Sequence, residues 1–161
     1  MSAGDEEAAI LLRGVRATMG AVAGSLARAF EELTPPQLRV LVLLRSTGEM
    51  QVGQVGTTLG LSPSGATRFV ARLDRDGWLH RRRATDDRRS VTVALTRKGE
   101  RFVDGLLVER GREMRRALDR VPEEDRATVL QGLRIFADAV DEPADSSTLE
   151  SLGFAAEDEG A

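Results

Sequence analysis

The 161-residue sequence contains no cysteine and a single histidine, His80. The missing cysteine excludes disulfides, cysteine-ligated zinc and thiol-based redox sensing, and one histidine excludes a histidine-rich metal site. No apolar run reaches the length of a membrane-spanning helix, and the N-terminal stretch MSAGDEEAAI lacks the basic region of a secretion signal. The sequence therefore predicts a cytoplasmic protein with no membrane partner, no metal and no cofactor.

Catalytic signatures are missing as well. The sequence has no phosphate-binding glycine loop, no nucleophile elbow, no cluster of metal ligands and no Ser-His-Asp set. His80 lies in a basic segment, where a lone imidazole is poor material for acid–base chemistry. We therefore predict that the protein is not an enzyme.

Positive charge is in deficit overall but concentrated in one segment. The formal net charge is -3, yet residues 62–101 contain eleven Lys and Arg against five Asp and Glu, a net of +6, which leaves -9 for the rest. A basic island in an acidic chain is typical of a local site for a polyanion. An ordinary solvated surface would carry the same charges, so charge alone leaves both interpretations open.

Residues 5–32 are predicted to form one long helix, because apolar residues recur there every three or four positions. The stripe consists of Leu11, Val15, Met19, Val22, Leu26 and Phe30. Three glycines within it each weaken the helix by roughly 1 kcal/mol relative to alanine. We therefore expect this helix to need a packing partner.

The central segment predicts three further helices. Thr34 and Gln37 form a capping box for a helix that begins at Pro35 and ends at Gly48. A short helix over residues 51–59 follows, and Ser62 then caps another helix that ends near Gly77. Two short helices joined by a tight turn make a helix-turn-helix.

The second helix of this motif has two distinct faces. Its apolar face is expected to point inward through Ala66, Phe69, Val70 and Leu73. The face left outward carries Pro63, Ser64, Thr67, Arg68, Ala71, Arg72 and Arg75. Small side chains allow a helix to enter a major groove, and hydroxyls and arginines bond phosphates and base edges there. A solvated face on a structural helix is the alternative.

Two strand-like runs follow, at residues 78–84 and 90–96, with a charged turn at 86–89 between them. A helix-turn-helix followed by a basic hairpin makes a winged helix. A hairpin tip is narrow enough to reach a minor groove, whose negative potential attracts arginine. The fold class predicted is thus mainly α with a small β-hairpin wing, and the DNA-binding domain spans residues 34–96.

The remaining segments predict helical arms and a tail. Thr96 can cap a helix over residues 97–120, and Pro122 opens a last helix to about Val140. Its stripe, expected to face inward, consists of Val129, Leu133, Phe136 and Val140. Residues 5–32 and 97–141 are predicted to form a dimerisation region. The acidic residues 142–161 are expected to be a mobile tail or a weakly docked short helix.

These patterns together resemble the MarR family of transcriptional regulators. The family's wing signature is Asp-x-Arg-x-x-x-Val/Ile-x-Leu-Thr-x-x-Gly, and the resemblance spans roughly residues 8–141. The fixed positions are filled here by Asp87, Arg89, Val93, Leu95, Thr96 and Gly99. Gly56 departs from the alanine usual in the first helix of the motif, so that helix is expected to be less stable.

The resemblance implies a homodimer of winged helices that binds double-stranded DNA, and its two-fold symmetry predicts a pseudo-palindromic operator. We expect a repressor, with an activator as the alternative that the sequence leaves open. Asp87 would brace Arg89 by an ion pair, and Arg88 and Arg89 would both contact DNA, with Arg88 nearest the minor groove. The recognition helix would contact DNA through Ser62, Ser64, Thr67, Arg68 and Arg72. A winged helix that binds an acidic protein partner is the rival interpretation.

The resemblance also implies a small, commonly aromatic effector that weakens DNA binding, although a protein without any sensing function is equally compatible with the sequence. Candidate pocket residues are Met19, Arg39, Arg45, Trp78 and His80. Each has a structural alternative: Met19 in the core, Trp78 between recognition helix and wing, and His80 on a strand surface.

Overall fold

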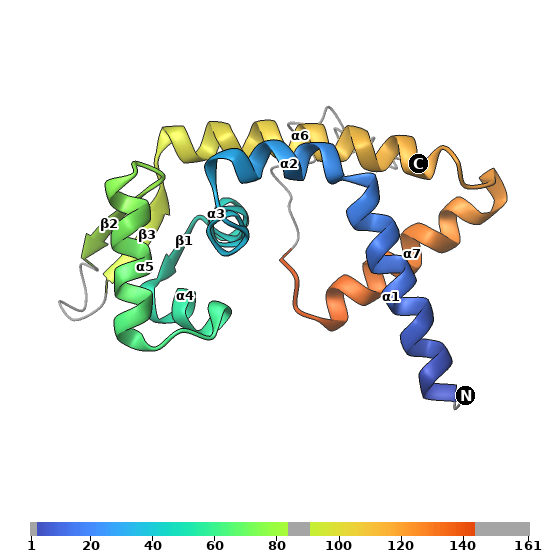
Figure 1. Cartoon of the computed structure of the whole chain (residues 1–161), viewed down its shortest axis with the longest axis horizontal. Helices are drawn as coiled ribbons and strands as arrows, with labels where there is room; N and C mark the ends of the chain where they lie inside the picture. Colours follow the sequence, from blue (N-terminus) through green and yellow to red (C-terminus); the bar gives the residue numbers. More distant parts are fainter. Residues whose placement is uncertain (1–2, 84–90, 144–161) are drawn as a thin grey trace, which may run out of the picture.

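The computed structural model describes residues 3–83 and 91–143. Helices dominate these residues, and a small sheet lies at one end of the molecule (Figure 1). The elements are α1 (Ala3–Ala21), α2 (Ala23–Glu32), α3 (Pro35–Thr47), β1 (Glu49–Gln51), α4 (Val52–Leu59), α5 (Pro63–Arg75), β2 (Leu79–Arg83), β3 (Val91–Leu95), α6 (Arg97–Leu118) and α7 (Glu123–Ala139). The prediction of a mainly helical fold with a winged helix-turn-helix is confirmed.

The sheet is antiparallel with the order β1-β3-β2. The two wing strands pair as predicted, with Leu79 opposite Leu95 and Arg83 opposite Val91. The sequence analysis missed β1, which pairs with β3 from Glu49↔Ala94 to Gln51↔Thr92. A three-residue strand is too short to show the alternation by which strands are recognised.

The winged-helix part, from α3 to β3, packs around one hydrophobic core to which α2 and α6 also contribute. Val40, Val55, Val70 and Val93, from four different elements, are each 0% exposed. Trp78 joins this core at 5% exposure, with Phe102 of α6 packed edge-on at a centroid distance of 5.0 Å. The long helix α6 is thereby fixed to the domain that precedes it.

The prediction of a single helix over residues 5–32 is wrong, because α1 and α2 meet at a bend of 69° around Val22. Beyond the bend, the backbone N–H of Ser25 donates to the Glu113 carboxylate at 3.1 Å, so a side chain of α6 caps the start of α2. A Cβ at Gly24 would lie 2.6 Å from the same carboxylate, so the glycine makes room for it. Among the described residues no single helix is long and apolar enough to span a membrane; the α1–α2 pair is, but only across this bend.

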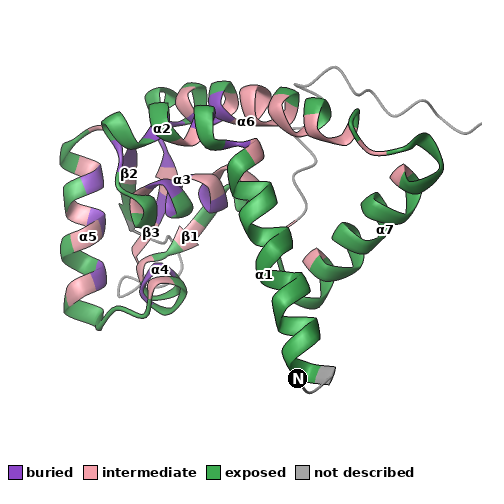
Figure 2. Cartoon of the chain, turned by 45° about the vertical axis from the view of Figure 1, so that its right-hand side comes forward, coloured by how far each residue is buried: buried purple, intermediate pink, exposed green. Residues whose placement is uncertain are grey.

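The prediction that the stripe of α7 faces inward is also wrong within one chain. Val129, Leu133, Phe136 and Val140 are 39–54% exposed, and α7 contains no buried residue. The stripe of α1 is equally open, so α1 and α7 form two largely exposed helical arms (Figure 2). Periodicity identifies an apolar face correctly but does not say what covers it.

Candidate nucleic-acid interface

One side of helix α5 is buried against the core, and the opposite side is exposed to solvent. Ser62 Oγ accepts from the N–H of Gly65 at 3.2 Å, which caps the helix as predicted, and Pro63 occupies its first turn. Ala66, Val70 and Leu73 are each 0% exposed, and Phe69 is half-buried. The predicted inward face is therefore confirmed, and the opposite face is free to meet a ligand.

The turn between α4 and α5 explains the unusual Gly56. Gly60 adopts φ +63° to end α4, and Leu61 N–H bonds back to the carbonyl of Gly56 at 2.8 Å. A Cβ at Gly56 would lie 3.1 Å from the Cβ of Ala66. The glycine thus allows α4 and α5 to approach closely, a benefit that offsets part of its cost to the helix.

The exposed face of α5 carries two kinds of side chain that are predicted to contact DNA, hydroxyls and guanidinium groups. Ser62 and Thr67 already use their hydroxyls inside the helix, since Thr67 Oγ1 donates to the carbonyl of Pro63 at 3.0 Å. Ser64 is exposed beside Ser62. Arg68 and Arg72 are exposed and have no ion pair among the described residues, so both guanidinium groups can bond phosphates or bases.

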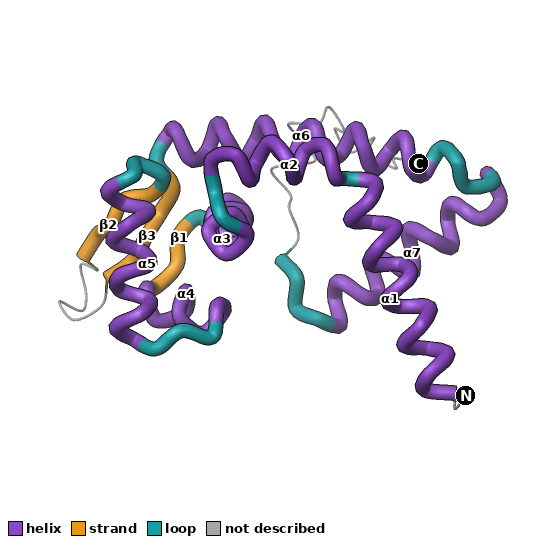
Figure 3. The backbone as a smooth tube through the Cα atoms, in the orientation of Figure 1, coloured by secondary structure: helices purple, strands orange, loops and turns teal. Residues whose placement is uncertain are grey.

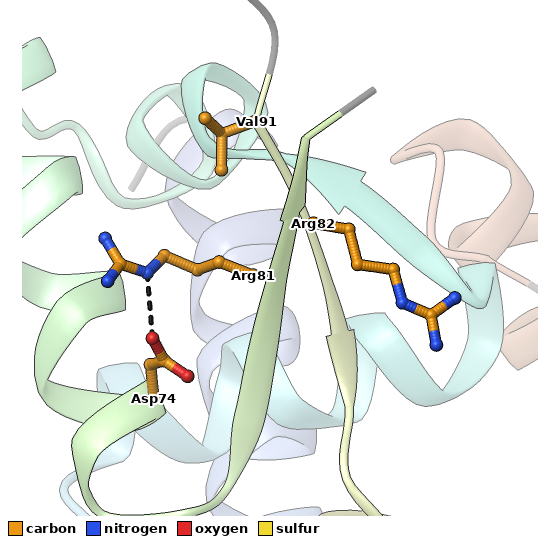
Figure 4. A pocket seen from close by; sticks show the side chains of 4 residues that line it. All are labelled: Asp74, Arg81, Arg82 and Val91. Atoms are coloured by element: carbon orange, nitrogen blue, oxygen red, sulfur yellow. Dashed lines mark hydrogen bonds and ion pairs between the residues drawn. The ribbon is translucent and has the colours of Figure 1, made fainter. Parts of the chain in front are cut away.

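The base of the wing is tied to α5 by an ion pair that the sequence analysis missed. Arg81 Nε of β2 donates to Asp74 Oδ2 of α5 at 2.8 Å, while Arg82 points to the other side of the strand (Figure 4). Asp74 and Val91 border a hollow of about 360 Å³ with these two arginines. Opposite charges on either side of the turn at Gly77 were the available signal, but sequence spacing alone does not bring them together.

The Thr-x-x-Gly part of the wing signature has a structural role here. Thr96 Oγ1 donates to the carbonyl of Gly77 at 2.7 Å and accepts from the N–H of Gly99 at 3.2 Å. A Cβ at Gly99 would lie 2.3 Å from the carbonyl oxygen of Trp78. This lock fixes the end of the wing, the end of the recognition helix and the start of α6 against one another.

The wing tip, in contrast, lies outside the described residues. Asp87, Arg88 and Arg89 all fall within residues 84–90, so the brace between Asp87 and Arg89 and the minor-groove contact of Arg88 stay predictions. The two strands that carry the tip are described and end beside α5 (Figure 3).

The five ligand candidates come from α1, α3, β2 and the segment just before β2, and whether they share one pocket stays a prediction. Trp78 is buried in the core, with Lys98 Nζ 3.6 Å from its ring centroid. Met19 is 58% exposed on α1, so its alternative as a core residue is wrong within one chain. His80 is half-buried on β2, and its buried Nε2 has no hydrogen-bond partner among the described residues.

The two remaining candidates form ion pairs that join the winged-helix part to other helices. Arg45 Nε lies 2.6 Å from Asp104 Oδ1 of α6. Arg39 holds both carboxylate oxygens of Glu142, which follows α7, at 2.6 and 2.5 Å. The hydrogen bonds from Arg39 lower the pKa of the Glu142 carboxyl below its usual range, and the partial burial of the carboxyl opposes this shift.

Comparison with known proteins agrees with this geometry. Residues 33–91 match the model of the MarR family. The chain is 31% identical over 110 residues to the HTH-type transcriptional regulator YfiV of Bacillus subtilis (strain 168), covering 68% of this chain and 69% of that protein. It is also 31% identical over 105 residues to the HTH-type transcriptional repressor MdtR of the same strain, covering 65% and 66%.

Among solved structures, the crystal structure of RV1404 from Mycobacterium tuberculosis superimposes with a TM-score of 0.78 at 29% identity. The match covers 89% of this chain and 98% of that one, so it includes the helical arms as well as the winged helix. The chain belongs to the MarR family of DNA-binding transcriptional regulators.

Proposed function

We propose that this protein is a homodimeric repressor that binds a pseudo-palindromic operator and places α5 in the major groove. One observation carries the proposal: α5 is sealed on its inner face, while the outer face presents Arg68 and Arg72 without counter-ions among the described residues. Ser64 and Thr67 add short polar side chains beside them. Such a face suits a groove that offers both phosphates and base edges.

The homodimer is proposed from the open arms. The exposed stripes of α1 and α7 are long apolar faces that one chain leaves uncovered, and a second copy would cover both. Two-fold symmetry would then place the two recognition helices at half-sites about 10 bp apart.

The wing is proposed as the second DNA element. Arg88 would insert into the minor groove, and Asp87 would hold Arg89 to shape the loop. Replacing Arg88 with alanine should weaken DNA binding with a small loss of fold stability, and Asp87→Ala should weaken it by releasing Arg89. If both variants give the same footprint as the parent protein, the wing does not contact DNA.

A small-molecule effector would have to bind two conformations of the protein with different affinities. Arg39 and Arg45 are the better placed candidates, because both lie where the winged-helix part meets the long helices. A small aromatic acid could displace Glu142 or Asp104 from its arginine. Calorimetric titration with such acids, on the parent and on Arg45→Ala, tests this role.

The decisive test of the proposed function is genomic footprinting followed by titration of the recovered duplex, with the regulator's own upstream region as the first target. Arg68→Ala should lose about 1–3 kcal/mol of binding and relax base preference at one position of the half-site. Arg112→Ala, at an exposed arginine on α6, is the control and should bind as the parent does. Equal, weak binding of genomic and random DNA would instead favour a winged helix that binds an acidic protein.

A further inference from the structure

We infer that the acidic segment 144–161 docks on the basic face of the winged helix and competes there with DNA. The basic face consists of Arg68 and Arg72 on the open side of α5, which are exposed and have no ion pair among the described residues. The inference rests on the proposed function, because the competitor that it names is DNA.

The two surfaces have complementary charge. Residues 144–161 contain five carboxylates and no Lys or Arg: Asp145, Glu150, Glu157, Asp158 and Glu159. Residues 62–101 have a net charge of +6. A series of carboxylates resembles a phosphate backbone in its negative charge. The same guanidinium groups can therefore bind either one.

The start of the segment is fixed beside the winged-helix part. Glu142 is held by Arg39 of α3 through two hydrogen bonds, of 2.6 and 2.5 Å. Its backbone N–H also bonds the carbonyl of Ala137 at 3.0 Å, which closes the end of α7. The acidic segment therefore departs from a point on α3 and not from the far end of the helical arms.

The distance from this point to the basic face is short compared with the length of the segment. Pro35 and Gln37, in the first turn of α3, line the same hollow of about 470 Å³ as Arg72 of α5. Arg39 lies one helical turn further along α3. Eighteen extended residues span up to about 60 Å, so the carboxylates can reach the whole basic face.

The hollow itself is not the docking site. Glu31, Glu32 and Asp76 also line it, and their carboxylates would repel the segment. Arg72 also lines this hollow, whereas Arg68, one helical turn nearer the start of α5, does not. We therefore place the carboxylates on the basic face, where they occupy the groups that DNA needs.

A weak contact is sufficient for this competition. A segment tethered by a short flexible linker has an effective concentration in the millimolar range, so even a millimolar affinity keeps it docked for much of the time. Docking stabilises the free protein and not the complex. It therefore lowers the affinity for operator and for random DNA by the same factor.

The test compares the full-length parent with two variants in duplex binding at about 50 and 300 mM salt. The first neutralises the five carboxylates by Asp145→Asn, Glu150→Gln, Glu157→Gln, Asp158→Asn and Glu159→Gln. The matched control keeps the carboxylates and replaces the large apolar residues of the segment by Leu149→Ser, Leu152→Ser and Phe154→Ser. The neutralised variant should bind at least about fivefold tighter at low salt, with little difference at high salt, and the control should bind as the parent does.

Binding equal to that of the parent for the neutralised variant would overturn the inference, as would an equal gain in the apolar control. A photo-crosslinking residue at position 154 separates docking from a general effect of net charge. Crosslinks should map to α5 and disappear when DNA is added; crosslinks to α1 or α7, or crosslinks that persist with DNA, would contradict docking. If no version of the protein binds duplex DNA, the proposed function fails, and the crosslinks still decide whether the segment docks.

Discussion

The winged-helix part and the helical arms differ in how completely each buries its apolar residues. In the former, Val40, Leu41 and Val93 are 0% exposed and belong to one continuous core. In the latter, Leu130 and Phe136 of α7 are each 53% exposed, and Leu12 of α1 is 62% exposed. The same helical periodicity thus leads to a closed core in one region and to an open face in the other.

This difference indicates which part of the stability is contained in a single chain. Burial of a large apolar side chain is worth roughly 1.5–3 kcal/mol, and the winged-helix part gains this many times over. The arms gain it only when something covers them. We therefore expect the winged-helix part to resist changes in the arms, while the arms depend on a second copy.

The largest effect is expected where the closed part is locked together. Gly99→Ala would place a Cβ 2.3 Å from the carbonyl oxygen of Trp78, against backbone that has no room to move. We expect a loss of about 2–4 kcal/mol in the free energy of unfolding, measured in urea.

Gly105→Ala on the same helix is the matched control. A Cβ there would meet nothing within 4 Å, so the substitution should stabilise α6 by up to about 1 kcal/mol. Equal free energies of unfolding for the two variants would mean that Gly99 does not lock the wing.

The next effect tests the open face. The double substitution Leu133→Glu and Phe136→Glu places two carboxylates in the exposed stripe of α7. We expect the dimer dissociation constant, measured by analytical ultracentrifugation, to rise at least about a hundredfold, because a dimer would have to bury these charges.

Arg134→Ala, at an exposed position between the two, is the control and should change the association by much less. The winged-helix part should stay folded in the double variant, with its near-ultraviolet circular dichroism from Trp78 retained. If the double variant sediments like the parent protein, α7 is not part of the subunit interface.

A smaller effect is expected at the bend between the regions. Glu113→Ala removes the carboxylate that caps the backbone N–H of Ser25, and the start of α2 then loses its partner. We expect a loss of about 1 kcal/mol in the free energy of unfolding. Gln at the same position retains an acceptor and should recover part of that loss; an unchanged stability in the alanine variant would show that the bend does not depend on this cap.

The smallest effect concerns the Arg39–Glu142 pair, whose side chains are 44% and 39% exposed. Because the pKa of Glu142 is lowered in the folded state, its stabilising contribution is present above the usual carboxyl pKa and is lost as the pH falls through the lowered value. Glu142→Gln should therefore cost less than about 1 kcal/mol at pH 7 and nothing near pH 2. A difference in unfolding free energy that does not depend on pH would contradict this.

Capping and turn residues allowed much of the fold to be predicted from the sequence. Ser62 and Gly48 act locally, as does the bond by which Thr96 caps Gly99, so these features follow from neighbours in the chain. The bend at Val22 was not predicted; the carboxylate that caps the start of α2 beyond it comes from Glu113, which is far away in the sequence. The sequence also left β1 unseen, since its stability comes from β3 and not from its own three residues.

The candidate site was predicted only in part, because some of its contacts are local and others join residues that are far apart in the sequence. The outward face of α5 follows by subtraction once its buried face is known, so the positions of Arg68 and Arg72 were foreseeable. The Asp74–Arg81 pair required the path of the chain through the turn at Gly77. The candidates for an effector pocket were chosen by residue type, which does not determine whether side chains from separate elements meet.

The measurement that tests the central claim most directly is the salt dependence of duplex binding by the full-length dimer, with Arg68→Ala and Arg72→Ala alongside the parent. If four to six phosphates are neutralised per dimer, log K should fall with log salt at a slope of roughly -4 to -5. Each variant should bind more weakly, and the loss of a phosphate contact in each subunit should make the slope shallower by about 2. An affinity that is flat across salt, or variants that bind like the parent, would contradict a DNA-binding role for the open face of α5.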